Sequence, residues 1–281
     1  MSEVRTLTPD EVGTAMEWAA GEGWNPGLDD AAAFLAQDKG AFLGAFEGEE
    51  LVACISAATY GEAFGFLGFY ICRPDMRGQG HGMNVWRAAM ERFGDRTIGL
   101  DGVVAQLENY QRSGFALAHR NIRYGGKAMA LPGAGGVSAI DISAMPGVLG
   151  FDRQHFLFDR PLFLEKWLAP AQGTALVARV DDAVAGYGVV RRCRAGHKIG
   201  PLFAADDDTA RALYAALSTA AHEAAPDEPL FLDVPEPNAA ARALAEDAGL
   251  APVFETARMY KGEAPALPLE RIFGITSFEL G

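Results

Sequence analysis

The most informative stretch of the chain lies between residues 69 and 83, which read Phe69-Tyr70-Ile71-Cys72-Arg73-Pro74-Asp75-Met76-Arg77-Gly78-Gln79-Gly80-His81-Gly82-Met83. An apolar run leads into a turn with three glycines at alternate positions, and a helical pattern follows directly. Glycines let successive backbone N–H groups converge without interference from Cβ atoms, and a helix N-terminus adds partial positive charge. The pattern therefore predicts a cradle for an anion, to which Arg73, Arg77 and His81 would add positive charge.

This turn differs from the two most familiar phosphate-binding motifs. No Gly-Lys-Ser/Thr ends it, and its spacing is not Gly-x-Gly-x-x-Gly. The strand that feeds it belongs to three β-branched or aromatic runs at about 41–47, 50–59 and 64–72, joined by hairpin-like turns. These runs predict an antiparallel meander rather than a βαβ unit. A glycine-rich turn without a ligand is the alternative interpretation.

The rest of the first half can be predicted outward from this meander. Two helices, opening near Pro9 and Leu28, flank an aromatic loop at 23–27. After the glycine turn, apolar spacing predicts a helix at about 80–93, a strand at 97–101, a helix at 104–112 and a strand at 115–124.

The second half repeats this order. Strand-like runs are followed by alternating helix and strand patterns, at about 174–180, 183–192, 197–204, 207–225, 229–234, 238–247 and 251–261. Matching triplets support the repeat, such as Gly99-Leu100-Asp101 with Phe231-Leu232-Asp233. A repeat of well over 100 residues indicates a duplicated domain, because solenoid units have only about 20–50 residues. We predict an α/β (α+β) chain with domains at 1–126 and 141–281 and a glycine-rich linker at 127–140.

Composition sets further bounds. A length of 281 residues fits two domains at about 150 residues each. The net charge of −13 argues against nucleic-acid binding and favours cationic small molecules or peptides as partners. The N-terminus lacks the pattern of a secretory signal, and no window has the ~18 apolar residues needed to cross a membrane, so we expect a cytoplasmic protein. The three cysteines and five histidines show no metal-ligand spacing, so we expect no metal.

At this point the chain resembles a known family. The strand, then Cys72-x-Pro74-x-x-Arg77-Gly78-x-Gly80-x-Gly82, then an apolar helix, is similar to the acetyl-CoA pyrophosphate loop of GNAT-superfamily N-acetyltransferases. The loop at 22–27 and the tail at 274–281 resemble a bacterial tandem-GNAT group with a diverged second domain. The resemblance implies two GNAT-like domains, each with a mixed, mostly antiparallel sheet flanked by helices.

The resemblance also implies roles for individual residues. Backbone N–H groups from Arg77 to Gly82 would hold the pyrophosphate, and the strand at Ile71 and Cys72 would run beside the pantetheine. The backbone N–H of Cys72 would polarise the thioester carbonyl. Tyr110, four residues before Gly114-Phe115, would donate a proton to the leaving sulfur. The positions implied for the cofactor are Ile71, Cys72, Arg73, Arg77, Gly78, Gln79, Gly80, His81, Gly82, Met83 and Asn109.

Some positions depart from the family pattern. Val103 stands where the family has an asparagine, and Asn109 is a substitute contact. Glu62 and Asp101 are candidate bases, and a chain of water molecules is the alternative. Trp24 and Asn25, in the loop on the acceptor side, are the predicted substrate contacts.

The second half lacks the residues that the resemblance assigns to cofactor binding and catalysis in the first half. Asn238 fits the family pattern, but Ala245 occupies the tyrosine position. Asp206, Asp207 and Asp208 replace the glycine turn, and carboxylates at a helix N-terminus would repel a pyrophosphate. We expect a degenerate domain that does not bind CoA but shapes the acceptor pocket.

The resulting hypothesis is acetyl transfer from acetyl-CoA to a primary amine of a small molecule or peptide, by direct attack in the first domain. We expect a monomer or homodimer. One alternative is a catalytically decayed acyl-CoA-binding regulatory module. Another is an acidic interaction scaffold without a cofactor.

Overall fold

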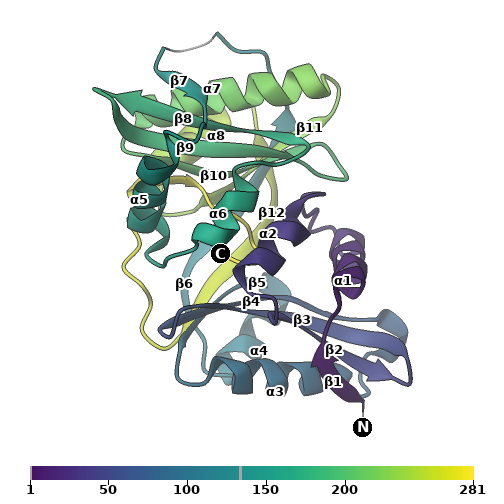
Figure 1. Ribbon diagram of the computed structural model, residues 1–281. Coiled ribbons are helices and arrows are strands. Elements are labelled where there is room, and N and C mark those ends of the chain that lie inside the picture. The colour runs from purple at the N-terminus through teal and green to yellow at the C-terminus, as the bar shows by residue number, and fades with distance from the viewer. Residues whose placement is uncertain (1, 133–134) are drawn as a thin grey trace.

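The computed structural model describes residues 2–132 and 135–281 and contains two similar halves that share one sheet (Figure 1). The strands of the first half are β1 (Glu3–Thr6), β2 (Phe42–Glu47), β3 (Glu50–Tyr60), β4 (Phe64–Cys72), β5 (Thr97–Val103) and β6 (Ala116–Lys127). Its helices are α1 (Pro9–Gly21), α2 (Asp30–Gln37), α3 (His81–Phe93) and α4 (Leu107–Arg112). A capping box between Thr8 and Glu11, with Pro9 in the first turn, explains why α1 begins there.

The second half repeats this order of elements. Its strands are β7 (Val137–Ala139), β8 (Gly173–Val180), β9 (Ala183–Arg192), β10 (His197–Ala204), β11 (Pro229–Pro235), β12 (Ala251–Lys261) and β13 (Ile272–Gly274). Its helices are α5 (Met145–Phe156), α6 (Pro161–Trp167), α7 (Asp207–Ala224) and α8 (Ala239–Asp247). The predicted elements are confirmed to within a few residues, whereas β1, β7, α5 and α6 were not predicted.

The two halves exchange their last long strands. The strand order is β1-β2-β3-β4-β5-β12-β6-β11-β10-β9-β8-β7, with β13 beside β10. β12 of the second half thus lies between β5 and β6, and β6 of the first half lies between β12 and β11. In this arrangement β12 covers the edge of β5, and an uncovered edge strand is a template for aggregation. The fold class of two tandem domains is confirmed, and the exchange joins their sheets into one.

Buried ion pairs fix the exchanged strands. Asp101 on β5 accepts hydrogen bonds from Arg258 on β12 at 3.0 and 2.5 Å. Asp233 on β11 accepts from Arg123 on β6 at 2.7 and 2.8 Å. All four side chains are almost fully buried. Each paired arginine therefore joins one half to the other, at related positions on the two sides of the central β12–β6 pair.

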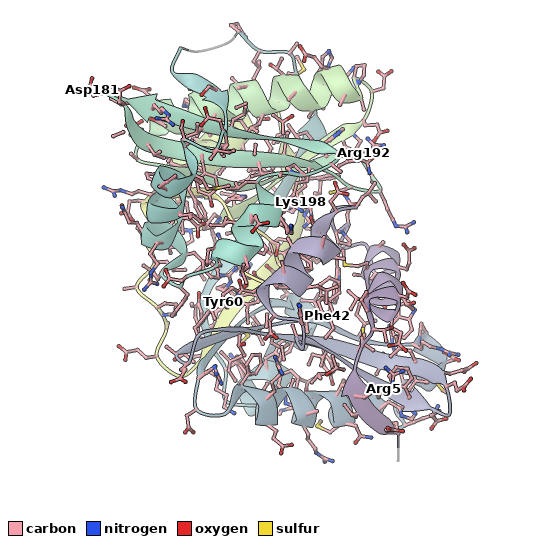
Figure 2. All side chains as sticks on the ribbon, viewed as in Figure 1. Arg5, Phe42, Tyr60, Asp181, Arg192 and Lys198 are labelled. Atoms are coloured by element: carbon pink, nitrogen blue, oxygen red, sulfur yellow. The ribbon has the colours of Figure 1, made fainter. Side chains whose placement is uncertain are left out.

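A shared hydrophobic core lies between the halves. α3 and α4 cover one face of the first half's sheet, and α1 and α2 lie on the other face, toward the second half (Figure 1). There Phe34 of α2 packs against Phe163 and Trp167 of α6, with ring centroids 6.5 and 6.0 Å apart. Phe42 and Tyr60 belong to the same core, in the densely filled space between the halves that Figure 2 shows. Burying each such side chain contributes roughly 1.5–3 kcal/mol, so the halves are held rigidly together.

The predicted linker at 127–140 is docked onto the second half. The N–H of Met129 donates to Ser218 of α7 at 2.9 Å, and that of Leu131 donates to Thr219 at 3.0 Å. β7 begins within the predicted linker, at Val137. Residues 133 and 134 of the linker lie outside the described residues. The domain boundaries stay a prediction, because β6 belongs to the first half in sequence and pairs with strands of the second.

Candidate active site

The site begins where two parallel strands separate. β4 pairs with β5 only from Phe64 to Leu67. Beyond Leu67, a bulge against β3 and a positive φ of 47° at Phe69 bend β4 away. The separation leaves a cavity of 790 Å³ that reaches from the glycine turn to the loop containing Trp24. Such a wedge exposes the backbone edge of β4 to a ligand that can pair with it as a strand would.

The glycine turn has the backbone of an anion cradle. Gly78 and Gly80 have φ values of 79° and 92°, which side-chain-bearing residues rarely adopt. Gly80 is the N-cap of α3 and provides no capping side chain, and the first turn of α3 has no acidic residue. The first N–H groups of the helix are therefore available to a negatively charged ligand.

The side chains around the turn point in different directions. Arg77 lines the cavity, as does Met83, and Arg77 donates to the carbonyl of Cys72 at 3.1 Å and to Glu22 at 2.7 Å. Arg73 instead pairs with Asp75 and Glu50, at 2.6 and 3.2 Å.

Two further side chains also turn away from the cradle. His81 is buried, with its Nε2 3.4 Å from Glu47, and Gln79 donates to the carbonyl of Asp75. The expected concentration of positive charge is therefore wrong for Arg73 and His81. Of the three predicted cations, Arg77 is the one that lines the cavity, which Arg112 of α4 lines as well, and His81 contributes its backbone to the turn.

Ile71 and Cys72 lie along the cavity. The N–H of Arg73 donates to Val52 of β3 at 3.0 Å. Because hydrogen-bonding directions alternate along an antiparallel strand, the N–H of Cys72 faces the opposite side, toward the cavity. Burial raises the pKa of the Cys72 thiol, which keeps it a neutral packed group rather than a nucleophile.

Tyr110 lies on the wall of the same cavity. It is in α4, packed against Trp86 and Phe115 with ring centroids 6.0 and 6.5 Å away. Burial, with a smaller effect from Tyr70, raises the pKa of its phenol to about 12, so the phenol is a proton donor at neutral pH. Val103 and Asn109 also line the cavity, and Asn109 donates to Gln106 at 2.6 Å.

The two predicted bases are placed unfavourably for that role. Asp101 lines the cavity, but its carboxylate is held by Arg258 and by Asn121, the latter at 2.8 Å. Glu62 is exposed in the turn that precedes β4, at the opposite end of that strand from the glycine turn. The geometry thus argues against both as acceptors of a proton.

The acceptor side of the cavity is built by both halves. Trp24 and Glu22 come from the loop after α1, Phe254 comes from β12, and Phe278 and Glu279 come from the C-terminal segment. Asn25 points elsewhere, since its amide exchanges two hydrogen bonds with the backbone of Ala195. Thr256 of β12 lines the cavity as well, so the prediction from sequence included Trp24 but missed the four residues that the second half contributes.

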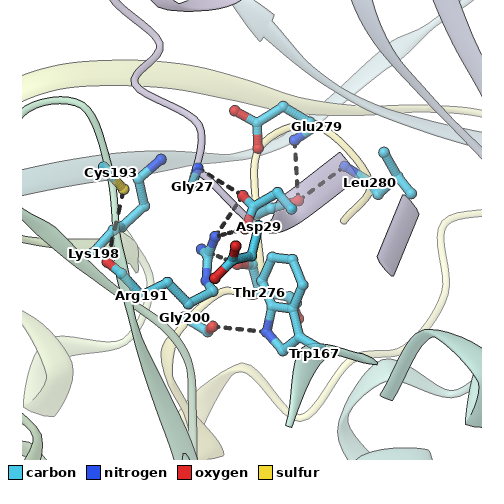
Figure 3. Close-up of polar contacts among 12 residues, drawn as sticks. Gly27, Asp29, Trp167, Arg191, Cys193, Lys198, Gly200, Thr276, Glu279 and Leu280 are labelled. Carbon is cyan, nitrogen blue, oxygen red and sulfur yellow. Dashed lines mark hydrogen bonds and ion pairs between the residues drawn. The ribbon is translucent and has the colours of Figure 1, made fainter. Parts of the chain in front are cut away.

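The second half also anchors the loop containing Trp24. The carbonyl of Trp24 accepts from Lys198 of the second half at 3.4 Å, and also from Arg123 on β6 of the first half at 2.8 Å. Nearby, Gly27 donates to Asp30, which pairs with Arg191 of β9. Figure 3 shows Arg191 and Lys198 approaching this loop from the second half, with the C-terminal segment beside them. The expectation that the second half shapes the acceptor pocket therefore has a physical basis in these contacts.

The C-terminal segment is seated directly on β4. A Cβ at Gly68 would lie 2.1 Å from the backbone oxygen of Glu279. Tyr60 donates to the carbonyl of Leu280 at 2.7 Å, and the N–H groups of Glu279 and Leu280 donate to Ser277. Glycine is required at position 68 because the segment passes so close.

The substitution Gly68→Ala should destabilise the protein by roughly 1–3 kcal/mol, because the backbone that it meets cannot rotate away. Urea unfolding measures the effect. Gly13→Ala is the matched control, since Gly13 is in an exposed part of α1 with open space around it and should gain about 0.5–1 kcal/mol. An unchanged unfolding midpoint for Gly68→Ala would show that the segment does not rest on β4.

The corresponding wedge in the second half is filled. β10 pairs with β11 from His197 to Ile199 and then separates from it. β13 occupies the gap, pairing with Leu202 and Phe203 of β10, and Ile275 donates to Asp233 of β11. Asn238 holds this segment by donating to the carbonyls of Leu269 and Ile272.

The N-terminus of α7 is capped within the chain as well. Asp206 accepts from the N–H of Thr209 at 2.8 Å, and Asp207 and Asp208 follow in the first turn. In the second half, the backbone edge of β10 is therefore already paired with β13, and the N-terminus of α7 is already capped by Asp206. The equivalent groups of the first half have no such partners within the described residues.

Two searches of residues 2–132 and 135–281 bear on other functions. They contain no group of three or more His, Cys, Asp or Glu side chains arranged to hold a metal ion. None of the helices described is both long and apolar enough to cross a membrane.

Comparisons with known proteins agree with this architecture. One family model, "Acetyltransferase (GNAT) family", matches residues 9–116, and another, "Acetyltransferase (GNAT) domain", matches residues 148–274. A holothin acyltransferase from Pseudoalteromonas sp. (strain SANK 73390) is 29% identical over 266 residues, which cover 94% of this chain and 90% of that protein.

Solved structures share the fold. A presumed acetyltransferase from Pyrococcus horikoshii superposes with a TM-score of 0.82 at 23% identity, covering 99% of this chain and 95% of the other. A tandem GNAT protein from the clavulanic acid biosynthesis pathway superposes with a TM-score of 0.66 at 15% identity, covering 94% and 100%. With two matched domains, an open wedge in the first and a related acyltransferase along most of its length, the chain belongs to the GNAT superfamily as an acyltransferase with tandem domains.

Proposed function

We propose that the protein transfers an acetyl group from acetyl-CoA to a primary amine, and that the reaction takes place in the first half. The observation that carries this proposal is the 790 Å³ cavity, which is lined by the edge of β4, Tyr110 and Trp24 and by Arg77 and Met83, the residues that flank the glycine turn. Each of these parts has a role in direct acyl transfer.

The residues of the cavity fit acetyl-CoA as follows. The backbone N–H groups from Arg77 to Gly82, together with the Arg77 guanidinium, would bind the pyrophosphate. The pantetheine would lie along Ile71 and Cys72, where the Cys72 N–H would donate to the thioester oxygen. Tyr110 would give its proton to the departing sulfur.

The opposite wall fits an amine. Trp24, Phe254 and Phe278 offer aromatic surfaces, and Glu22 offers a carboxylate at the same side of the cavity. Aromatic faces and carboxylates both attract a cationic amine before it loses its proton. The related protein from Pseudoalteromonas is named as a holothin acyltransferase, and for this chain we propose a small organic amine as the acceptor class.

The proposed activity is restricted to the first half because the second has no equivalent space. β13 fills the wedge between β10 and β11, and Asp206 caps α7. A decayed regulatory module is less consistent with the first half, where the cradle is uncapped and Tyr110 still reaches the cavity. Val103 in place of the family's asparagine removes one cofactor contact and leaves the backbone contacts.

Calorimetric titration of acetyl-CoA into the wild type and Gly80→Glu tests the proposal. The new carboxylate would face the pyrophosphate, so we expect at least about tenfold weaker binding. Gly61→Glu is the matched control, because Gly61 also has a positive φ, of 64°, and open space, but lies in the turn before β4. Wild-type protein that binds no acetyl-CoA, or equal loss in both variants, would overturn the proposed site.

A further inference from the structure

One of the residues that line the cavity, Glu279, has a buried carboxylate without a partner. Glu279 is 2% exposed, and neither of its carboxylate oxygens has a hydrogen-bond partner among the described residues. Its backbone rests on Gly68 of β4, at the point where β4 leaves β5. In Figure 3 a dashed line reaches its backbone N–H, but none reaches its carboxylate. Leaving a buried polar group unpaired costs about 1–3 kcal/mol, so the position calls for a function.

The charges around Glu279 come from five elements of the protein. The charged groups that face it are Lys198 on β10, Arg123 on β6, Arg191 on β9, Asp30 on α2 and Asp233 on β11. Asp30 and Asp233 are each held by an arginine, and Lys198 donates to the carbonyl of Trp24. Burial raises the pKa of the Glu279 carboxyl, and Lys198 and Arg123 oppose that effect. Glu279 thus differs from the other two carboxylates of this cluster in having no ion-pair partner.

The remaining carboxylates of the cavity are also engaged. Asp101 is bound by Arg258, and Glu22 is paired with Arg77 at 2.7 Å in an exposed position. Among the acidic residues described in the lining of the cavity, Glu279 is therefore the one whose carboxylate oxygens have no hydrogen-bond or ion-pair partner. It also follows Phe278 on the acceptor side, on the wall that the second half provides.

We propose that Glu279 is the general base, which accepts the proton of the acceptor amine. This inference rests on the proposed function of the cavity. The amine nitrogen attacks the thioester carbon, a C–N bond forms and the C–S bond breaks. One amine proton passes to the Glu279 carboxylate, and the proton of the Tyr110 phenol passes to the sulfur. Exchange with solvent then deprotonates Glu279 and reprotonates Tyr110, so the overall products are an amide and a free thiol.

Comparison of Glu279→Gln and Glu279→Asp with the wild type tests the assignment. The readouts are thiol release with a panel of spermidine, glucosamine, lysine and tryptamine, acetyl-CoA binding by calorimetry, and thermal unfolding. Slow hydrolysis of acetyl-CoA, in which water loses a proton in the same way, serves where no panel amine reacts. We expect Glu279→Gln to lower kcat at least about 100-fold and to remove the acidic limb of its pH profile. Glu279→Asp should keep that limb with an intermediate kcat.

A purely structural role gives a different result. It predicts a lower unfolding temperature with a wild-type kcat and pH profile, and that outcome would overturn the inference. Should Glu279→Gln fail to fold, a wild-type kcat in Glu279→Asp overturns it equally, because a shorter carboxylate would no longer reach the amine. A wild type that neither binds nor turns over acetyl-CoA defeats the proposed function itself. If both variants bind acetyl-CoA as the wild type does, the proposed cavity stands, and any failure concerns only the role of Glu279.

Discussion

Replacing Tyr110 with phenylalanine is expected to lower kcat roughly 100-fold while leaving the Kd of acetyl-CoA unchanged. The variant keeps the ring that packs between Trp86 and Phe115 but removes the proton that the leaving thiolate needs. Stopped assays of thiol release give kcat and KM, and calorimetry gives the Kd. The two measurements distinguish loss of the acid from loss of the binding site.

The pH profile adds a second criterion for Tyr110. Because its pKa is raised to about 12, the phenol stays protonated through neutral pH, so it should cause no fall in kcat between about pH 7 and 9. Tyr214→Phe is the matched control, since burial also raises the pKa of Tyr214 to about 12, but it lies in α7 of the second half. Equal losses in both variants, or a wild-type kcat for Tyr110→Phe, would refute the role as acid.

Replacing Asp101 with asparagine is expected to cost about 3–5 kcal/mol of stability and to lower the unfolding temperature by several degrees. The Arg258 guanidinium is almost fully buried and would lose its counter-ion without gaining water. Asparagine retains the shape, so the effect reports the charge. Chemical unfolding measures the loss, and kcat measured well below the unfolding temperature should stay within a few-fold of the wild type.

The control for Asp101 is an ion pair on the surface. Glu108 and Arg112 are paired at 3.2 Å, with side chains 81% and 74% exposed. Such pairs contribute little, so Glu108→Gln should leave the unfolding midpoint almost unchanged. If Asp101→Asn instead kept full stability and lost activity, the result would support Asp101 as the general base and contradict the structural role that its ion pair with Arg258 indicates.

Local patterns in the sequence were sufficient to predict most helices and strands of this fold and some residues of the candidate site. The glycine turn and the spacing of Tyr110 depend on a few neighbouring residues, and Tyr110 lines the cavity, as do Arg77 and Met83 on either side of the turn. The exchange of β6 and β12 could not be predicted, because the two strands have similar sequence patterns, and these patterns do not show with which half each strand pairs. The partner of Asp101 is 157 residues away, and no periodicity in the sequence connects them.

The C-terminal segment carried a signal that sequence reasoning did not use. It follows β13, which pairs with β10. Glu279 stands between Phe278 and Leu280, in a run that is otherwise apolar. An ionisable residue within such a run is rarely buried without a reason, so it marked a candidate site. Its position in the cavity still depended on the three-dimensional path of the chain.

The exchanged strands also constrain how the chain can fold during its synthesis. When the first half leaves the ribosome, β5 lacks its native neighbour β12 until residues 251–261 emerge, about 150 residues later. The incomplete sheet must be shielded in the meantime, which makes the nascent chain a natural client for chaperones. Once the last strand has inserted, neither half can open without disrupting the other, so the two domains should melt in a single cooperative transition.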